Sequence, residues 1–585
     1  MKKLLWTMAL PPMQAIVRLK TLNGMYARVR METAGRGEQD TRGFLRAVLE
    51  ELECGWALGQ GDLEKIPESG SLLVVANHPF GAIEGLCLAA LLLERRPDVK
   101  IMANGLLAHI EELSDLFVLV NPFKTKGSHR DSLSGLRQTM CWLKKGGVLG
   151  MFPAGEVSSL DVRSRRVADS CWSDQVARIV RKTGADVLPV YFGGRNGPLF
   201  HLAGMVHPGL RTLLLPSEML RMRRSRIEVR IGSPVPHRRL CSFETDRQMV
   251  SYLRARTYNL GCRKKEPKVW SSAGTAIGVL QKNVLEMARQ EAEAVDSENV
   301  LTETEEFRVF IDRAARIPSL LQEIGRCRET AFRQVGEGTG KATDLDIYDS
   351  TYLHLVLWDK VRQTVAGAYR IGESDKLLQR FGTKGLYACS LFSIKPRFFS
   401  RIGPALELGR SFIMPEYQRM YAPLLLLWKG IGVFVAKNPH YRTLYGPVSI
   451  SDSYQTISKR YMLEFLRRFH NGGELERLVR PHHPPRFAKD GWPDIKSCFG
   501  EGVRSMEDLS DLVRDVEPGL RDVPVLLRQY LRLGGSVIGF NTDKTFGNAL
   551  DGLIVVDLTR VEPGLLKRFM GRADAKRYLS ERFTA

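Results

Sequence analysis

Long hydrophobic runs are scarce in this sequence, and their scarcity limits how the chain can meet a membrane. The two longest apolar stretches cover residues 86–93 and 421–436, and Lys429 interrupts the second. A helix that spans a bilayer needs about 18 or more apolar residues without interruption. The sequence therefore predicts a protein that lies on a bilayer and does not cross it.

Paired cysteines are also missing. The nine cysteines are scattered, and none forms a Cys-x-x-Cys pair, so the sequence indicates neither a zinc ribbon nor a disulfide framework. We expect a reducing cytosol and no bound metal. The first ten residues have the basic head and apolar stretch of a secretory signal, but the stretch ends at Pro11, and we interpret it as a short anchor or a frayed terminus.

Acidic residues are few relative to basic ones. The 86 Lys and Arg outnumber the 65 Asp and Glu, for a net charge of +21. Such an excess suits nucleic acid, an anionic bilayer or an acidic protein. Because no nucleic-acid recognition motif accompanies the charge, we expect no nucleic-acid partner and favour an anionic membrane surface or an acidic protein.

Hydrophobic patterning predicts an α/β protein of two domains in a chain of 585 residues. In the first half, strand patterns alternate with helix patterns (strands 71–76, 147–152, 187–192 and 226–231; helices 40–52, 86–96 and 174–183). Strand and helix patterns resume in the second half (strands 307–311, 353–359, 363–371, 536–540 and 552–557; helix 318–333). Composition changes between them, which predicts domains at residues 1–262 and 300–585 with a linker at 263–299.

The first candidate site follows the strand at residues 71–76. The strand delivers Asn77 and His78 into a Pro/Gly turn, and Glu84 begins the next helix. A carboxylate folded back onto an imidazole fixes its tautomer and stabilises the imidazolium, which makes the ring a base toward a hydroxyl. The alternative is a histidine hydrogen-bonded in a tight turn for structure alone.

Three motifs in order give a family resemblance over about residues 72–235. They are Asn77-His78-Pro79-Phe80-Gly81, the stretch Phe152-Pro153-Ala154-Gly155-Glu156, and Leu188-Pro189-Val190. Together they resemble the glycerolipid and lysophospholipid acyltransferase superfamily. The resemblance implies that His78 is the general base on an acceptor hydroxyl and that Glu84 orients it. It also implies substrate-binding positions at Asn77, Phe152, Pro153, Gly155 and Glu156.

Two departures from that family affect the expected acceptor. Glu84 replaces the usual aspartate, and the stretches 121–124 and 157–160 lack the arginines of members that use phosphate acceptors. A phosphate is best held by an arginine fork, so the acceptor is expected not to be a glycerol phosphate. Nearby basic residues could substitute for the fork (Lys124, Lys126, Arg163 and Arg165).

The second candidate site gathers charged residues at the ends of predicted elements in the second half. Its members are Arg328, Asp346, Asp349, Arg370, Glu407 and Arg410, with Phe332 beside them. Mixed charges of this kind could frame a zwitterionic amine acceptor. The alternative is a set of surface ion pairs with little consequence.

The spacing of these residues also carries a resemblance. Arg328-x-x-x-Phe332, Asp346-x-x-Asp349, Gly367-x-x-Arg370 and Glu407-x-x-Arg410 resemble the N-acyl amino acid and homoserine-lactone synthase branch of the acetyltransferase-like fold. Residues 307–557 resemble the hemolysin-like group that includes ornithine N-acyltransferases, and the fused pair resembles bifunctional ornithine-lipid synthases. The resemblance implies a mixed-sheet α/β domain in which Glu407 helps to deprotonate the amine. The aspartates would hold cationic parts of the acceptor, and the arginines its carboxylate or the helix scaffold.

The expected acyl donor is a thioester on acyl carrier protein, and we expect no other cofactor. Residues 411–419 lack the glycines that would cradle the pyrophosphate of CoA. Acyl carrier protein is strongly acidic, and basic clusters at residues 221–226 and 263–265 could dock it or an anionic bilayer.

The resemblances imply a two-step synthesis at the cytoplasmic face of a bacterial inner membrane. The C-terminal domain would N-acylate ornithine with a 3-hydroxyacyl group, and the N-terminal domain would O-acylate the resulting lyso-aminolipid. Three alternatives stay open: another amino acid acceptor (lysine, glycine or glutamine), a lysophospholipid acyltransferase with a non-catalytic C-terminal half, and a non-enzymatic membrane-active protein.

Overall fold

The computed structural model describes most of the chain (residues 18–33, 41–104, 110–120, 128–161, 166–263, 281–487, 499, 502–517, 519 and 521–580). Several sequence predictions lie outside these residues: the N-terminal stretch, the 121–124 motif with Lys126, the arginines at 163 and 165, and the lysines at 264 and 265. No helix within the described ranges is both long and apolar enough to cross a membrane.

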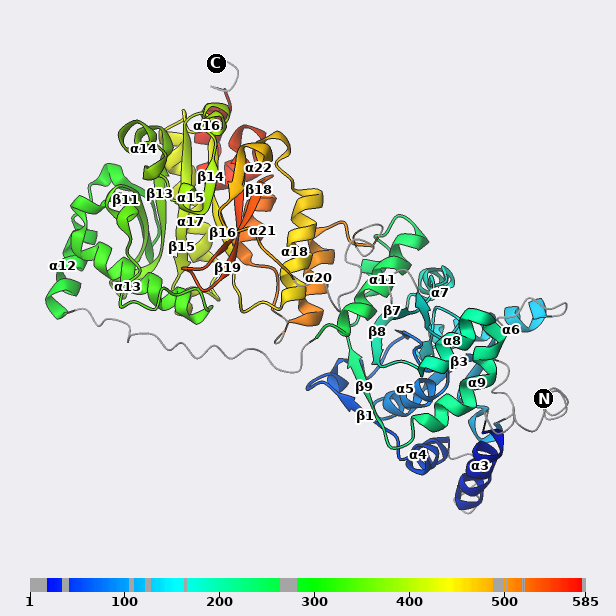
Figure 1. Ribbon diagram of the computed structural model, residues 1–585. Coiled ribbons are helices and arrows are strands. Elements are labelled where there is room, and N and C mark those ends of the chain that lie inside the picture. The colour runs from blue at the N-terminus through cyan, green and yellow to red at the C-terminus, as the bar shows by residue number, and fades with distance from the viewer. Residues whose placement is uncertain are drawn as a thin grey trace. The chain divides into compact units, whose positions relative to one another are not determined.

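Two compact units make up the chain, and both are of the predicted α/β class (Figure 1). The first contains Met1–Lys265 together with Trp492–Val516, and the second contains Glu266–Gly491 together with Glu517–Ala585. The boundary between the units differs from the predicted linker at 263–299. Residues 282–293 of that linker form helix α12, which belongs to the second unit.

The first unit is built on a seven-stranded sheet in which β9 is antiparallel to β8 and every other neighbouring pair is parallel. The strand order is β1 (Gly55–Leu58), β9 (Arg226–Ile231), β8 (Asp186–Gly193), β2 (Leu72–Ala76), β5 (Val148–Met151), β3 (Val99–Asn104) and β4 (Phe117–Val120). A short hairpin of β6 (Ser159–Asp161) and β7 (Arg166–Ala168) lies apart from it. The helices are α3 (Leu19–Thr33), α4 (Thr41–Glu51), α5 (Ile83–Leu93), α6 (Ser128–Lys144), α7 (Gln175–Thr183), α8 (Pro198–Val206), α9 (Pro208–Arg221), α10 (His237–Leu240), α11 (Asp246–Leu260) and α20 (Met506–Val516).

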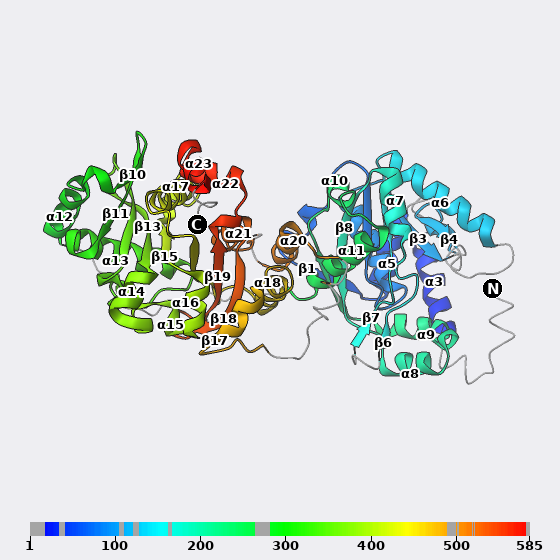
Figure 2. The same cartoon turned by 90° about the horizontal axis from the view of Figure 1, so that it is seen from above.

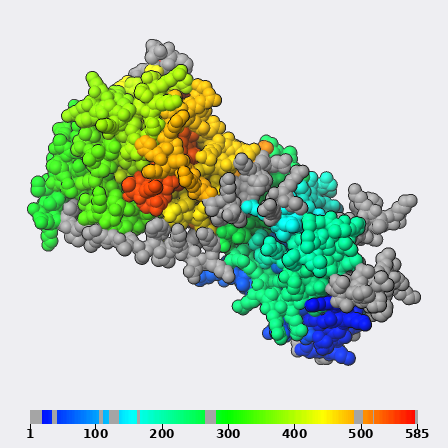
Figure 3. Space-filling view, in the orientation of Figure 1, coloured from blue at the N-terminus to red at the C-terminus, as the bar shows by residue number. Residues whose placement is uncertain are grey.

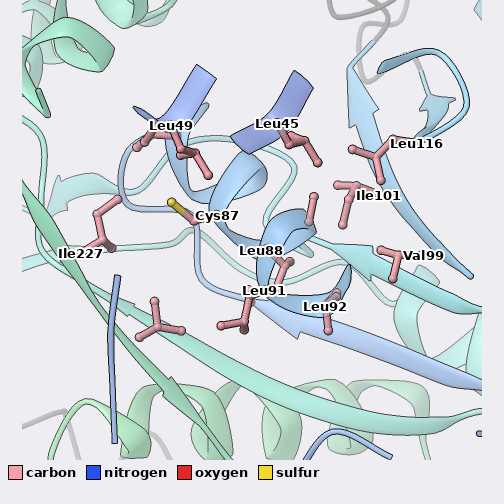
Figure 4. Close-up of a cluster of buried hydrophobic side chains, with 14 of the residues drawn as sticks. Leu45, Leu49, Cys87, Leu88, Leu91, Leu92, Val99, Ile101, Leu116 and Ile227 are labelled. Carbon is pink, nitrogen blue, oxygen red and sulfur yellow. The ribbon is translucent and has the colours of Figure 1, made fainter. Parts of the chain in front are cut away.

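Helices cover both faces of this sheet, which is why the central strand β2 is buried throughout. Leu72, Val74 and Ala76 belong to the core cluster that contains α4 and α5, because alternate residues of a strand point to opposite faces. Figure 4 shows Leu45 and Leu49 of α4 together with Leu88 and Leu91 of α5 in this cluster. The other face of β2 packs against residues of α7 and α11. A fully apolar strand is typical of a parallel sheet covered on both faces.

Helix α20 completes the first unit from far along the chain. Its apolar face is fully buried (Leu509, Leu512, Val513 and Val516) and the helix packs against α11. Arg256 of α11 donates to Asp515 at 2.9 Å, and Tyr252 donates to Asp511 at 2.6 Å. The sequence placed this segment in the C-terminal domain. An amphipathic pattern predicts that a helix buries one face but does not reveal the partner.

The second unit is built on an eight-stranded mixed sheet. Its order is β10 (Val300–Glu303), β11 (Phe307–Arg313), β12 (Leu353–Asp359), β13 (Thr364–Glu373), β15 (Ala405–Ile413), β16 (Thr443–Ile450), β19 (Ala549–Asp557) and β18 (Ser536–Asp543). A small pair, β14 (Phe392–Ile394) with β17 (Val479–Pro481), lies apart from it. The helices are α12 (Lys282–Glu293), α13 (Pro318–Gln334), α14 (Ser374–Phe381), α15 (Ala388–Leu391), α16 (Pro396–Ile402), α17 (Ala422–Lys437), α18 (Thr456–Phe469), α21 (Val525–Arg532), α22 (Pro563–Met570) and α23 (Arg572–Ser580).

The pair β15 and β16 is the one parallel pair of this sheet, and it is short. The two strands pair only from Ala405 to Glu407 on β15, and β15 continues to Ile413 without β16 as a partner. On its other side β15 pairs with β13, with a bulge in which Arg410 and Ser411 of β15 lie opposite the single residue Tyr369 of β13. The sheet therefore opens beside the residues of the second candidate site.

Candidate functional site

The predicted pair of histidine and glutamate is assembled in the first unit. Nδ1 of His78 lies 2.9 Å from Oε1 of Glu84, whose side chain is completely buried. The same oxygen accepts the backbone N–H groups of Phe80 and Gly81 at 2.8 and 2.7 Å. Because Nδ1 faces the carboxylate, Nε2 is the ring nitrogen left for a substrate hydroxyl.

Electrostatics keep the Glu84 carboxyl charged despite its burial. Burial by itself would raise the pKa of Glu84, but the neighbouring His78 ring and the backbone N–H groups outweigh it, and the pKa lies below its usual value. A buried carboxylate that stays ionised stabilises the imidazolium that forms when His78 takes a proton. The pair therefore has the charge arrangement of a general base.

The turn between β2 and α5 folds Glu84 back onto His78. Gly81 has a φ of +100°, and a Cβ there would lie 2.5 Å from Leu215 of α9 and 2.7 Å from Val157. Only glycine fits a position with this φ and this little space. The Phe80 carbonyl accepts a hydrogen bond from Asn196 at 3.2 Å, which fixes the turn from the other side.

Asp169 holds the backbone of the histidine, and the sequence analysis missed it. Oδ1 of Asp169 accepts the His78 backbone N–H at 3.1 Å and the Ser158 hydroxyl at 2.5 Å. Oδ2 accepts the indole N–H of Trp172 at 2.9 Å. The Ser158 N–H donates to the His78 carbonyl at 2.8 Å, so both backbone groups of the histidine are occupied.

The other predicted residues of this site have different positions. Phe152 stacks on the His78 ring with centroids 4.4 Å apart. Asn77 joins β2 to β8 through two hydrogen bonds with the Phe192 backbone, at 2.9 and 2.7 Å. Glu156 pairs with Arg211 of α9 at 3.2 Å. Asn77 is therefore a structural bridge, whereas Phe152 contacts the predicted base directly.

The Phe-Pro-x-Gly stretch forms a turn beside the histidine. The Pro153 carbonyl accepts the Ser173 N–H at 3.0 Å, and the Gly155 N–H donates to the Phe152 carbonyl at 3.0 Å. Gly155 has a φ of +69°, which suits glycine in such a turn. Its N–H group is engaged within the turn.

The charged residues predicted in the second unit form one continuous network. Arg328 contacts Asp349 at 3.1 Å, and Arg370 contacts Asp349 at 3.3 Å and Asp346 at 2.6 Å. Arg410 lies 3.5 Å from Asp346 and 3.4 Å from Asp344, a member that the sequence analysis did not single out. The network is buried except at its edge, where Asp346 and Arg410 are partly exposed. These are not surface ion pairs.

Burial and charge divide the aspartates of this network. Burial would raise the pKa of Asp349, but the guanidinium groups of Arg328 and Arg370 outweigh it and lower the pKa to about 2. For Asp344 burial dominates over Arg410 and Arg328, and its pKa is raised. Asp349 is therefore held as a carboxylate, whereas the raised pKa of Asp344 favours its neutral form.

Arg370 keeps unused hydrogen-bond donors within the described part of the chain. Nε and Nη2 are buried and have no hydrogen-bond partner in the described part of the chain. The guanidinium lies over the rings of Tyr348, Tyr352 and Tyr387, at 5.7, 5.3 and 5.2 Å from their centroids. A planar guanidinium with free N–H groups is suited to an anionic carboxylate.

Arg410 owes its position to the irregularity in β15. It has a φ of +47°, which is strained for a residue with a side chain. An extra residue in one strand redirects the side chain next to it. Its guanidinium lies 5.1 Å from the Tyr387 ring centroid and 4.7 Å from that of Phe546. Phe332 packs against Phe546 and Phe412, so it supports the site from the apolar side.

Glu407 is enclosed. It is 1% exposed, and its oxygens accept the Tyr352 hydroxyl at 2.6 Å and the Ala388 N–H at 2.5 Å. Burial raises the pKa of Glu407 despite these hydrogen bonds. Glu407 therefore reaches the rest of the site through Tyr352, which lies beneath Arg370. In the described ranges no group of three or more His, Cys, Asp or Glu side chains is arranged to hold a metal ion.

Comparison with known families matches both units. Residues 35–265 match the family described as acyltransferase, and residues 327–429 match the acetyltransferase (GNAT) domain. A glycine N(alpha)-acyltransferase of Phocaeicola vulgatus is 29% identical over 242 residues, which cover 39% of this chain and 73% of the relative. A lyso-glycine lipid O-acyltransferase of the same organism is 28% identical over 224 residues, which cover 37% of this chain and 77% of the relative.

Among solved structures, the 1-acyl-sn-glycerophosphate acyltransferase PlsC of Thermotoga maritima is similar at 18% identity and a TM-score of 0.27, covering 43% of this chain and 97% of that one. The family matches and the acyltransferase relatives exclude the non-enzymatic alternative. The chain is therefore an enzyme that transfers acyl groups, in which an N-terminal acyltransferase domain is joined to a C-terminal domain of the GNAT type.

Proposed function

We propose that this chain makes an aminolipid in two acyl-transfer steps. The C-terminal domain transfers a 3-hydroxyacyl group from acyl carrier protein to the α-amine of ornithine, and the N-terminal domain then acylates the free 3-hydroxyl. The observation that carries this proposal is the presence, in one chain, of a His78–Glu84 base pair and a buried Arg–Asp network. The relatives named for N-acylation of glycine and O-acylation of the lyso-lipid support the pairing of two such steps.

In the second step His78 takes the proton of the acceptor hydroxyl. The hydroxyl oxygen attacks the thioester carbonyl, the C–S bond breaks, and the thiolate leaves with the proton that the imidazolium returns. Glu84 stabilises the imidazolium between these events, since its carboxylate lies 2.9 Å from Nδ1. Stacking on Phe152 limits how the ring can turn.

In the first step the network holds the amino acid. The free donors of Arg370 bind the α-carboxylate, and the partly exposed Asp346 attracts an ammonium group. Glu407 receives the proton of the α-amine through a relay that begins at the Tyr352 hydroxyl, because the Glu407 carboxyl group is itself buried. A raised pKa makes Glu407 a better proton acceptor than an ordinary carboxylate.

Three further buried carboxyl groups favour a diamino acid. Glu337, Asp543 and Asp551 interact electrostatically with one another or with Arg410, and Oδ2 of Asp551 has no partner in the described residues. Burial raises the pKa values of Glu337 and Asp551, so a further cation nearby would be needed to hold both groups as carboxylates. The side-chain ammonium of ornithine would supply it. Glycine is the second candidate, since the relatives are named for it.

The donor is proposed from the opening in the sheet. Beyond Glu407 the edge of β15 has no pairing with β16, so its backbone groups can bind an extended thioester arm. Acyl carrier protein presents such an arm without a nucleotide. We place both reactions at the inner face of the bacterial inner membrane, where both substrates meet.

The test is expression of the chain in a host without aminolipids, with mass spectrometry of its lipids. The wild type is expected to yield the diacylated lipid. His78→Ala and Glu84→Gln should accumulate the lyso-lipid, because only the ester step is lost, whereas Glu407→Ala should remove both products. Arg401→Ala, at an exposed ion pair, is the control.

Feeding labelled ornithine, lysine, glycine or glutamine identifies the acceptor. Label from glycine but not ornithine in the product would replace the proposed acceptor and leave the chemistry standing. Intact diacylated lipid from the His78→Ala chain would contradict the assigned roles of the two domains.

A further inference from the structure

Helices α8 and α9 form an antiparallel hairpin with an unusual outer surface. Gly197 at the start of α8 donates to Glu218 near the end of α9 at 2.9 Å, which sets their direction. The outward side of α8 is apolar: Leu199, Leu202, Met205 and Val206 are 61, 55, 52 and 80% exposed. Leu210, just past the bend, is 37% exposed. We name these five residues the hairpin face.

Buried residues on the inner side of α8 fix the orientation of the hairpin face. On the inner side of α8, Phe200 is completely buried and His201 nearly so, so the helix is anchored with its apolar exterior turned outward. The nine residues of α8 include no Asp, Glu, Lys or Arg. Figures 1 and 2 both place α8 and α9 side by side at the surface of the first unit, and Figure 3 shows that surface. An exposed apolar cluster of this kind marks an interaction site.

The charges around the hairpin indicate what it binds. Three arginines lie at the end opposite the bend (Arg221, Arg223 and Arg224) and pair with only two carboxylates, Glu218 and Glu53, so one positive charge remains in excess among these five residues. An apolar bend with a basic base matches a bilayer, in which acyl chains lie below anionic headgroups. A protein partner would not require this order of charge and apolarity.

The hairpin also covers the catalytic turn. Leu215 of α9 occupies the space beside Gly81, and Arg211 bonds to Glu156 and to the Val157 carbonyl, next to Ser158, which holds the backbone of His78. A surface that binds lipid at this place would bring a membrane-bound acceptor close to the base.

We propose that the hairpin face inserts into the acyl-chain region of an anionic bilayer and delivers the lyso-lipid acceptor from it to His78. This inference rests on the proposed ester step. The bend enters first, and insertion is no deeper than the length of α8, about 14 Å, because the basic end stays among the headgroups. The protein thereby takes its acceptor from the membrane plane and not from solution.

The test is sedimentation of the full chain with vesicles of phosphatidylethanolamine, with and without phosphatidylglycerol. The wild type is expected to bind the anionic vesicles more tightly, and Leu202→Glu with Val206→Glu should weaken binding at least about tenfold, because two apolar side chains are lost from the bilayer. Val361→Glu, at a valine that is 76% exposed in the second unit, is the matched control and should bind as the wild type does. Wild-type binding by the double variant would overturn the proposal.

Activity assays separate this inference from the proposed function. The double variant should acylate a lyso-lipid dispersed in detergent as fast as the wild type, and lose about tenfold when the lyso-lipid is embedded in vesicles. If the double variant acylates both forms of the lyso-lipid as fast as the wild type, the hairpin face does not bind the membrane, but the proposed ester step stands. No O-acylation by the wild type in detergent would instead contradict the proposed function. A hairpin that governs self-association without vesicle binding, seen by sedimentation velocity, would also overturn the inference.

Discussion

Buried carboxyl groups fall into two classes in this chain. Glu84 and Asp349 have lowered pKa values because cationic or N–H partners outweigh burial. Glu337 and Glu407 have raised pKa values because burial dominates. The first class provides fixed negative charge, and in the second Glu337, with a pKa of about 7, can exchange protons near neutrality. This division is the residue-level basis for separating positioning roles from proton transfer.

Removing Arg328 should destabilise the second unit severely. Arg328→Ala leaves the buried Asp349 without its main partner, which costs about 3–5 kcal/mol of unfolding free energy. Chemical denaturation would measure the loss. Arg401→Ala, at a pair in which both partners are exposed, should change it by less than about 1 kcal/mol. A similar loss in the two variants would mean that the network is not a buried unit.

Glu337 should give the second unit a pH-dependent stability. Burial raises its pKa from 4.5 to about 7, so between these values the folded chain holds a proton that the unfolded chain lacks. The free energy of unfolding therefore falls as pH rises through this window, by roughly 3 kcal/mol. Glu337→Gln should match the wild type near pH 4.5 and gain on it toward pH 8. A constant difference between the two chains across denaturation curves would refute this.

At the scale of elements, a few irregular segments place the reactive groups. The turn between β2 and α5 folds Glu84 onto His78, and the extra residue in β15 directs Arg410 into the network. Both segments contain a residue with positive φ, Gly81 in the first and Arg410 in the second. Regular strands provide the frame, and these departures from regularity provide the sites.

Substituting Gly81 should disable one step only. The added Cβ of Gly81→Ala would overlap Leu215 and Val157, which forces the turn and the histidine to move. A displacement of this size costs on the order of 100-fold in rate. Gly146→Ala is the control, since Gly146 also has a positive φ but open space around it. Separate assays of ester and amide formation should show loss of the ester step alone.

Local patterns predicted elements well where a run of residues determines its own environment. The apolar run at β2 and the charged residue that opens α5 are adjacent, so the His78–Glu84 pair could be predicted from one short segment. Asp169 could not, because it lies 91 residues away and acts on the backbone of His78. The short edge strands β1 and β4 escaped prediction as well, since four residues carry little periodicity.

The site in the second unit was predicted as a set of residues but not as a network. The motif spacing named Arg328, Asp349 and Arg370, which the fold brings into contact. It omitted Asp344, which only the bulge in β15 brings to Arg410. The motif spacing also did not predict that Tyr352 would cover Glu407. The spacing of motifs in the sequence does not reveal contacts that depend on an irregular backbone.

At the scale of the whole molecule, the chain enters the first unit twice. Residues 492–516 return to it after most of the second unit, and α20 covers the buried face of α11. Arg256 and Asn259 of α11 bond to Asp515 and the Leu512 carbonyl of α20. The first unit therefore depends on residues that a simple division at the linker would remove.

A fragment of residues 1–265 should be less stable than the same unit in the full chain, because it exposes α11 and leaves Arg256 unpaired. Adding a peptide of residues 492–516 should raise its thermal midpoint with increasing concentration. The peptide with Leu512→Asp, which puts a charge on the buried face, should not. An unchanged midpoint with the unaltered peptide would show that α20 is dispensable.

The order in which these segments leave the ribosome follows from the same feature. A nascent chain that stops before residue 492 lacks α20 of the first unit and also β18 and β19 of the second. The first unit therefore receives α20 only when synthesis has passed residue 516, and the second unit receives β19 only when synthesis has passed residue 557.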